Sequence, residues 1–291
     1  MFNLNLLVIL LLGYYYYYHI MMIGMPTLSM GFILMSFYNY IIKNDIRKSR
    51  GYLFFGLSGM STILLAPPFF LCLPYVILFD YDDRKYMDKI QKIWARLITS
   101  CFYKTNVIGM ENILSLKNNP AVYISNHGSY LDAYTLLWLD NVRIKIILKK
   151  ELMLIPVIGW VLGILGHIPF TRSNKKSRKN AIIECNKVLK RNNSIFVFPE
   201  GGRSRTGEIG EFKIGAFKLS YENNVPIVPI YIHGAHEMLK PSNNLSLGYG
   251  EITMTIYKPI YPNNYKSVGE FREKVRDFYL LKRQEKLIKN E

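Results

Sequence analysis

The first 42 residues of this chain contain no aspartate, glutamate, lysine or arginine, and a second run without these residues covers residues 51–79. A helix that crosses a bilayer needs roughly 20 apolar residues, so both runs are long enough to do so. In the first run, Gly24 and Pro26 separate two predicted helices, at about residues 4–23 and 27–42. We therefore predict a hydrophobic helical membrane anchor over residues 1–79 and a globular domain over residues 80–291.

The second uncharged run contains Pro67, Pro68 and Pro74, which argue against one straight helix. A kinked or re-entrant pair of helices, lying partly in the membrane interface, fits this run better. A cleavable signal peptide is the alternative for the first run, but that run lacks a positive n-region. Between the runs lies a basic loop, which by the positive-inside rule faces the cytoplasm (Lys43, Arg47, Lys48 and Arg50). We expect the globular domain on that same side, or on the matrix side of an organelle.

Short apolar runs alternate with stretches of helical periodicity after residue 80. An amphipathic helix is predicted over residues 80–104 and a charged, solvent-facing helix from Lys266 onwards. Strands are predicted over residues 121–125, 144–148, 167–171, 194–198, 227–232 and 252–257, and helices over 131–139, 156–165, 175–191 and 212–222. This alternation predicts an α/β fold with a mixed, largely parallel sheet flanked by helices.

The net charge of +16 is concentrated in part of the chain, because residues 141–191 contain 12 Lys+Arg and 2 Glu. A basic region beside a hydrophobic anchor suits an anionic membrane surface or phosphate-bearing ligands. Many of these lysines also serve simply to solubilise helix faces. Nucleic acid is not a predicted partner, since the chain has no zinc-finger spacing, helix-turn-helix pattern or basic-zipper heptad.

The cysteines and histidines indicate neither a disulfide framework nor a metal site. The chain has 3 cysteines, widely spaced and without a CxxC pair, which is typical of a reducing compartment. Two of its 5 histidines, His233 and His236, lie close together, but their spacing matches no strong metal motif. We therefore predict no bound metal.

The segment Asn126-His-Gly-Ser-Tyr-Leu-Asp132 offers a general base and a carboxylate to orient it. A predicted strand runs into His127, Ser129 is placed as a helix N-cap, and Asp132 takes the acidic position of a capping box. With His127 in the loop and Asp132 in the first turn, the carboxylate can reach back to the imidazole and fix its tautomer. No serine or cysteine is evidently paired with this histidine, so the base would deprotonate a substrate hydroxyl. A capping aspartate beside a structural histidine is the alternative.

A second segment, Phe198-Pro-Glu-Gly-Gly-Arg-Ser-Arg205, follows another predicted strand. Ligands bind at the carboxyl ends of strands in open α/β sheets. There Gly201 and Gly202 permit close backbone approach. Arg203 and Arg205 suit bidentate contact with phosphate. Arg172 is a third cation at the end of a predicted strand, unless it only opens the basic run that follows.

At these residues the chain resembles the 1-acylglycerol-3-phosphate acyltransferase family, over about residues 97–257. Residues 126–132 are similar to the first motif of the family, 150–172 to the second, 198–204 to the third and 225–230 to the fourth. The resemblance implies that an acyl chain passes from acyl-CoA or acyl-carrier protein to the sn-2 hydroxyl of lysophosphatidic acid. The product would be phosphatidic acid, made at a membrane without a metal or organic cofactor.

The resemblance also implies roles for individual residues. His127 would be the general base and Asp132 would orient it. Four residues would hold the glycerol phosphate: Arg172, Glu200, Gly201 and Arg203.

One residue departs from the family pattern, because Gly202 stands where the family usually has threonine. This difference leaves the acceptor open, and glycerol-3-phosphate or another lysophospholipid is the alternative. A non-catalytic membrane protein that binds phospholipid is the alternative of a different class. An intact His–Asp pair argues against that class, since a binding protein needs no base.

Overall fold

The computed structural model describes residues 24–288 except 81–82, 117–118, 141, 156–157 and 243–244. The helix predicted over residues 4–23 lies outside the described residues.

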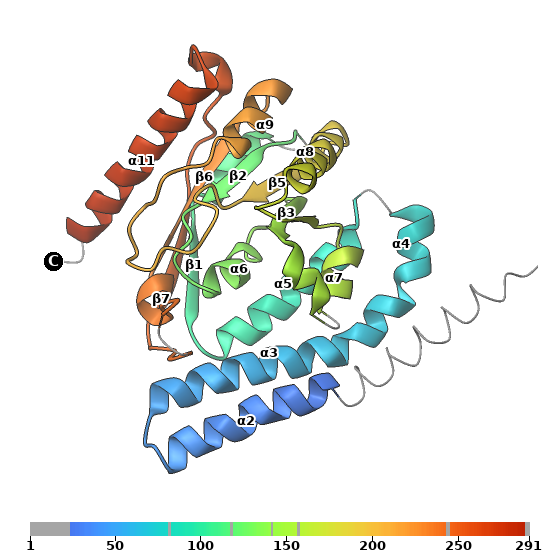
Figure 1. Ribbon diagram of the computed structural model, residues 1–291, viewed down its shortest axis with the longest axis vertical. Coiled ribbons are helices and arrows are strands. Elements are labelled where there is room, and N and C mark those ends of the chain that lie inside the picture. Colours follow the sequence, from blue (N-terminus) through green and yellow to red (C-terminus); the bar gives the residue numbers. More distant parts are fainter. Residues whose placement is uncertain are drawn as a thin grey trace, which may run out of the picture.

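One seven-stranded sheet forms the centre of the molecule, in the order β1-β7-β6-β2-β5-β3-β4 (Figure 1). Its only antiparallel neighbours among the described strands are β6 and β7. The strands are β1 Lys104–Ile108, β2 Val122–Ser125, β3 Ile144–Lys149, β4 Ile168–Phe170, β5 Ser194–Val197, β6 Ile227–His233 and β7 Glu251–Ile256. The predicted α/β class and largely parallel sheet are confirmed, and all six predicted strands are present. β1 was not predicted.

Helices cover both faces of the sheet, and each face has its own apolar core. On one face, Tyr123 and Phe196 of the sheet pack with Phe54 and Leu131 from the helices. The helices and 3-10 turns on this side are α3 Ile46–Leu71, α5 Lys85–Ser100, η2 Met110–Leu116, α6 Leu131–Leu136 and α10 Ala235–Met238. The opposite face is covered by α8 Lys175–Lys190, α9 Gly215–Asn223 and α11 Val268–Ile288. Shorter elements complete the chain: η3 Lys150–Leu154, α7 Ile158–Ile164 and η4 Pro262–Asn264.

The N-terminal part of the described chain is helical, as predicted. α2 Met25–Ile41 and α3 lie side by side as a hairpin, and α4 Leu73–Phe79 follows (Figure 1). The uncharged run is thus two helices, but the break falls at Cys72 rather than at Pro67-Pro68. Pro74 then lies in the first turn of α4, where proline costs no hydrogen bond. No helix within the described ranges is both long and apolar enough to cross a bilayer.

The hairpin is joined to the sheet domain rather than separate from it. Phe54 of α3 is fully buried in the core of the sheet domain. The first turn of α3 also contacts a remote loop, since the Leu247 N–H donates to the Arg47 carbonyl at 2.9 Å. A division of the chain after residue 79 stays a prediction.

The C-terminal helix α11 was expected to face solvent, and this part of the prediction is wrong. Phe271, Val275 and Tyr279 are buried, because their spacing of four residues places them on one face of the helix against α9 and the sheet. The charged residues occupy the other faces. Arg276 and Arg283 reach across to Glu211 and Glu208, in the loop that follows β5.

Tyr279 also completes the hydrogen bonding between β2 and β6. Its hydroxyl accepts from the Ile230 N–H at 3.0 Å and lies 2.8 Å from the Ile124 carbonyl, to which it can donate. The side chain is 1% exposed, and burial raises the pKa of its hydroxyl well above the ordinary value. Tyr279, far along the chain, therefore links β2 to β6 at Ile124, which is three residues before His127.

We expect Tyr279→Phe to lower the free energy of unfolding by about 1 kcal/mol, because it removes a buried hydroxyl that accepts from the Ile230 N–H and donates to a strand carbonyl. Urea unfolding of the purified protein in detergent measures this difference. Tyr221→Phe is the matched control, since Tyr221 is exposed, and we expect a change within about 0.5 kcal/mol there. Equal stabilities of the Tyr279 variant and the wild type would show that this hydroxyl does not contribute.

Candidate active site

The two predicted site segments meet at one edge of the sheet. β2 and β5 are parallel neighbours, with Tyr123 opposite Phe196 and Ile124 opposite Val197. Parallel neighbours end at the same edge, so the segments that begin at Asn126 and Phe198 emerge side by side. The Ser204 N–H donates to the His127 carbonyl at 2.7 Å and ties the two segments together.

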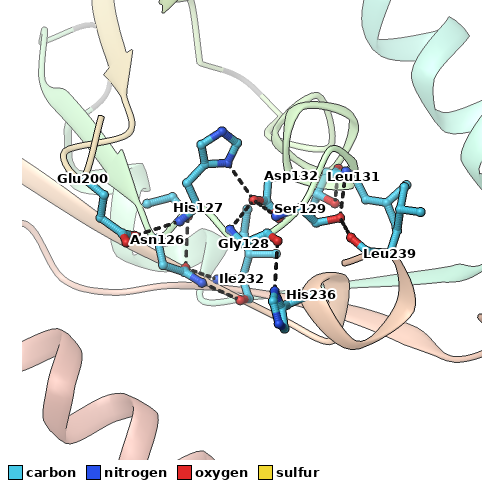
Figure 2. Close-up of polar contacts among 12 residues, drawn as sticks. Asn126, His127, Gly128, Ser129, Leu131, Asp132, Glu200, Ile232, His236 and Leu239 are labelled. Atoms are coloured by element: carbon cyan, nitrogen blue, oxygen red, sulfur yellow. Dashed lines mark hydrogen bonds and ion pairs between the residues drawn. The ribbon is translucent and has the colours of Figure 1, made fainter. Parts of the chain in front are cut away.

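Asn126 sets the point at which the chain leaves the sheet. Its side-chain amide donates to the Ile232 carbonyl at 2.9 Å, and its side-chain oxygen accepts from the Ile232 N–H at 2.8 Å. The amide thus imitates one more strand residue paired with β6. The backbone is free to turn away, and His127 projects from the end of the strand (Figure 2).

His127 and Asp132 form the predicted pair. Nδ1 of His127 lies 2.8 Å from Oδ2 of Asp132, as Figure 2 shows. The same oxygen accepts the N–H groups of Gly128 at 2.8 Å and Ser129 at 2.9 Å. Because the carboxylate accepts at Nδ1, the proton is held there and Nε2 is left as the acceptor. Asp132 is 1% exposed, so water does not compete for these hydrogen bonds.

The capping box predicted at Ser129 is present in part. Asp132 makes the reciprocal bond to the Ser129 N–H, but α6 begins at Leu131 with Tyr130 before it. The Ser129 hydroxyl accepts from the Leu131 N–H at 3.2 Å and donates to the Leu239 carbonyl at 2.8 Å. Because the hydroxyl already donates one hydrogen bond and accepts another, and the side chain is fully buried, Ser129 is not a nucleophile for His127.

Phe198 is a site residue that the sequence did not identify as such. Its ring stacks on the His127 imidazole, with centroids 3.8 Å apart and planes at 14°. This contact and the bond to Asp132 together fix the plane of the imidazole.

Glu200 lies between the two segments rather than beside open space. One carboxylate oxygen accepts from the His127 N–H at 3.0 Å and the other from the Gly210 N–H at 3.0 Å. Burial raises the pKa of Glu200, and the two backbone hydrogen bonds act in the opposite direction. The geometry favours a brace that holds the His127 loop against the loop of residues 200–214. Gly201, at the start of that loop, has φ +73, which a side chain would strain.

Three cations surround the glycine turn. A methyl group built on Gly202 would lie 3.5 Å from Nη1 of Arg172, and one built on Gly201 would lie 3.7 Å from Cγ of Lys213. Arg203 follows directly, and its Nη1 is buried without a hydrogen-bond partner in the described structure. None of Arg172, Arg203 and Lys213 forms an ion pair with any described residue. Unpaired cations at one turn can bind an anion such as phosphate.

His236 contacts both loops. Its Nδ1 lies 3.0 Å from the Gly128 carbonyl, and Figure 2 shows the ring below that carbonyl. A methyl group on Gly207 would lie 2.9 Å from Cδ2 of the same ring. His236, one of the two histidines that lie close together in the sequence, therefore holds the two site loops in place. No local pattern around His236 indicates this, because its partners are about 30 and 110 residues away in the chain.

Comparison with known proteins finds a family whose sequence model matches the region of the chain that holds these residues. Residues 104–233 match the sequence model of the family described as Acyltransferase. The chloroplastic 1-acyl-sn-glycerol-3-phosphate acyltransferase of Brassica napus is 39% identical over 212 residues, which are 73% of this chain and 61% of that protein. The 1-acyl-sn-glycerol-3-phosphate acyltransferase of Saccharomyces cerevisiae is 34% identical over 201 residues, 63% of this chain and 64% of that protein. Residues 104–233 of the chain thus match the acyltransferase family.

A solved structure has the same fold. The crystal structure of the 1-acyl-sn-glycerophosphate acyltransferase PlsC of Thermotoga maritima superposes with a TM-score of 0.62 at 24% identity. The match covers 80% of this chain and 98% of that one. The chain spans about three fifths of the length of the Brassica and Saccharomyces relatives.

Proposed function

We propose that this protein is an O-acyltransferase that acylates the sn-2 hydroxyl of lysophosphatidic acid and so makes phosphatidic acid. The observation that carries the proposal is the His127–Asp132 pair, which lies beside unpaired cations that suit an anion, and whose Nε2 has no hydrogen bond to a serine or cysteine among the described residues. A base without its own nucleophile serves a hydroxyl that the substrate brings. The family match of residues 104–233 and the names of the relatives support acyl transfer to a lysophosphatidic acid acceptor.

In the proposed reaction, His127 carries one proton from the acceptor to the leaving group. Nε2 of His127 takes the proton of the lysophosphatidic acid hydroxyl. At the same time the hydroxyl oxygen attacks the thioester carbonyl of acyl-CoA or acyl-carrier protein. The tetrahedral intermediate collapses, the carbon–sulfur bond breaks, and His127 returns the proton to the leaving thiolate. Asp132 stabilises the imidazolium that exists between these steps.

The acceptor phosphate binds at the glycine turn. Arg203 offers two parallel N–H groups to phosphate oxygens, and Arg172 adds charge beside Gly202. Gly201 allows the backbone to approach the ligand. Glu200 contributes by holding the turn against the His127 loop.

The helices before the sheet domain bring the site to a membrane surface. Large apolar side chains of α2, α3 and α4 are exposed, and the most exposed are Ile41, Leu64, Leu71, Leu78 and Phe79. Such a surface marks a membrane or protein contact, and the lipid nature of both substrates favours a membrane. We propose that residues 1–79 anchor the protein and that its catalytic domain lies on the cytoplasmic or organelle-matrix face.

An acceptor panel tests the proposed function. Purified protein in mixed micelles receives labelled oleoyl-CoA or acyl-carrier protein with lysophosphatidic acid, glycerol-3-phosphate or lysophosphatidylcholine. We expect lysophosphatidic acid to be acylated with the highest kcat/KM. A higher kcat/KM for glycerol-3-phosphate would mean that the enzyme makes lysophosphatidic acid, one reaction earlier in phospholipid synthesis. Failure of every acceptor in a folded preparation would favour a phospholipid-binding protein.

Gly202→Thr tests whether the departure from the family pattern decides the acceptor. Gly202 is outside the left-handed region, and a methyl group there would meet Arg172 at 3.5 Å, an ordinary contact. We therefore expect a folded enzyme whose KM for lysophosphatidic acid stays within roughly 3-fold of wild type, a difference below about 1 kcal/mol. A change of preferred acceptor in the panel would contradict this and make Gly202 a specificity residue.

A further inference from the structure

The aromatic ring of Tyr130 lies against the guanidinium group of Arg203. The central carbon of the guanidinium is 3.5 Å from the ring centroid, which is the distance of a close cation–π stack. Tyr130 comes from the first site segment and Arg203 from the second. The contact therefore joins the loop of the base to the turn that we propose for phosphate.

Tyr130 is held on a rigid support. Its neighbour Ser129 is fully buried with both hydrogen bonds made, and its neighbour Leu131 is also fully buried and starts α6. The edge of the ring meets Phe55 of α3, with centroids 6.2 Å apart and planes at 85°. The ring thus has a defined position although 42% of the residue is exposed.

Arg203 has no comparable support from polar groups. Within the described residues its side chain forms no ion pair, and Nη1 is buried without a partner. A long arginine side chain without partners would have many rotamers, and ordering it on binding costs affinity. A stack on one face of the plane restricts those rotamers and leaves the N–H groups at the edge free for a bidentate ligand.

We propose that Tyr130 is a positioning residue for the acceptor phosphate, and that it acts by holding the Arg203 guanidinium over its ring. The proposal rests on the proposed function for the identity of the ligand. Because Phe55 of α3 contacts the ring, Tyr130 also connects Arg203 to the helical hairpin that precedes the sheet domain. Tyr130 does not touch the reacting atoms, so its removal affects binding of the acceptor and not the chemical step.

Two substitutions separate the stack from other roles of the ring. Tyr130→Leu keeps an apolar side chain against Phe55 but removes the aromatic face. Tyr130→Phe keeps the face and removes only the hydroxyl, which has no hydrogen bond within the described structure. The readouts are the Kd of 1-oleoyl lysophosphatidic acid by titration calorimetry in mixed micelles, the KM values of acceptor and donor, and kcat.

We expect Tyr130→Leu to raise the acceptor Kd and KM by roughly 3- to 30-fold. Its kcat and donor KM should stay within about 2-fold of wild type, and Tyr130→Phe should match wild type, as expected if only the stack is lost. Equal acceptor Kd in the Leu variant and wild type would overturn the proposal. A Phe variant as weak as the Leu variant would also overturn it, because the hydroxyl would then be the active group.

The same experiment separates this proposal from the proposed function. Wild-type protein that binds lysophosphatidic acid without acylating it would contradict the function, while the two Kd values would still decide the role of Tyr130. Wild-type protein that does not bind lysophosphatidic acid would contradict both. A thermal unfolding scan of each variant identifies loss of fold, which would count against a local role for the ring.

Discussion

Replacement of His127 by alanine is expected to lower kcat by about 100- to 10,000-fold, the usual cost of removing a general base. The reason is that Nε2 of His127 is the proton acceptor in the proposed mechanism, whereas Ser129 is buried and its hydroxyl is already hydrogen-bonded. Steady-state rates of phosphatidic acid formation at saturating substrate measure the effect. The KM of lysophosphatidic acid should change little, because we propose that its phosphate binds at Arg172 and Arg203.

His127→Gln is the matched variant for this experiment. Glutamine has a side-chain N–H that can still donate to Asp132, but it has no nitrogen that takes up a proton at neutral pH. Both variants should therefore be inactive and both should unfold near the wild-type temperature. Turnover of the glutamine variant within 10-fold of wild type would remove His127 from the role of base.

Asp132→Asn is expected to have an effect of similar size through a different cause. The equivalent change in a serine-protease triad lowers kcat about 10,000-fold, because the histidine loses its required tautomer. Here Oδ2 of Asp132 also accepts from the N–H groups of Gly128 and Ser129, so the asparagine oxygen is kept on those two donors. The imidazolium then has no opposing charge. Because the asparagine oxygen also lies at Nδ1 of His127, the tautomer is kept and only the charge is lost. We therefore expect a roughly 100- to 1,000-fold loss of kcat, the usual size of one electrostatic contact to a charge that develops in the transition state, measured in the same assay.

The stability of the Asp132→Asn variant distinguishes orientation of the base from a purely structural role. A variant that loses activity but retains binding of lysophosphatidic acid supports the catalytic role. Retained activity together with lowered stability would mean that Asp132 serves only the backbone of residues 128–129. That result would also weaken the assignment of His127.

The strands that end at the site were predictable because each is a short apolar run followed by a turn. Residues 122–125 and 194–197 are buried strands that pair directly, and this is why residues 126 and 198 meet. β1 was missed because Lys104–Ile108 is a polar edge strand with no apolar run. The charges of α11 likewise concealed its buried face, although Phe271, Val275 and Tyr279 show the helical spacing.

The side-chain partners within the site could not be predicted in the same way. Asp132 is five residues from His127, so a turn followed by a helix already brings them together. Phe198, His236 and Tyr130 contact their partners only because separate strands and loops converge at one edge of the sheet. The brace formed by Glu200 also depends on this convergence, since its two donors are 73 and 10 residues away.

The most direct test of the central claim is the position at which a new acyl chain is attached. Wild-type protein is incubated with 1-oleoyl lysophosphatidic acid and an acyl thioester labelled in its acyl chain, and the product is digested with an sn-2-specific phospholipase. We predict labelled phosphatidic acid whose label is released as free fatty acid by this digestion. Labelled product that resists the digestion, or no labelled phosphatidic acid, would contradict the proposed reaction.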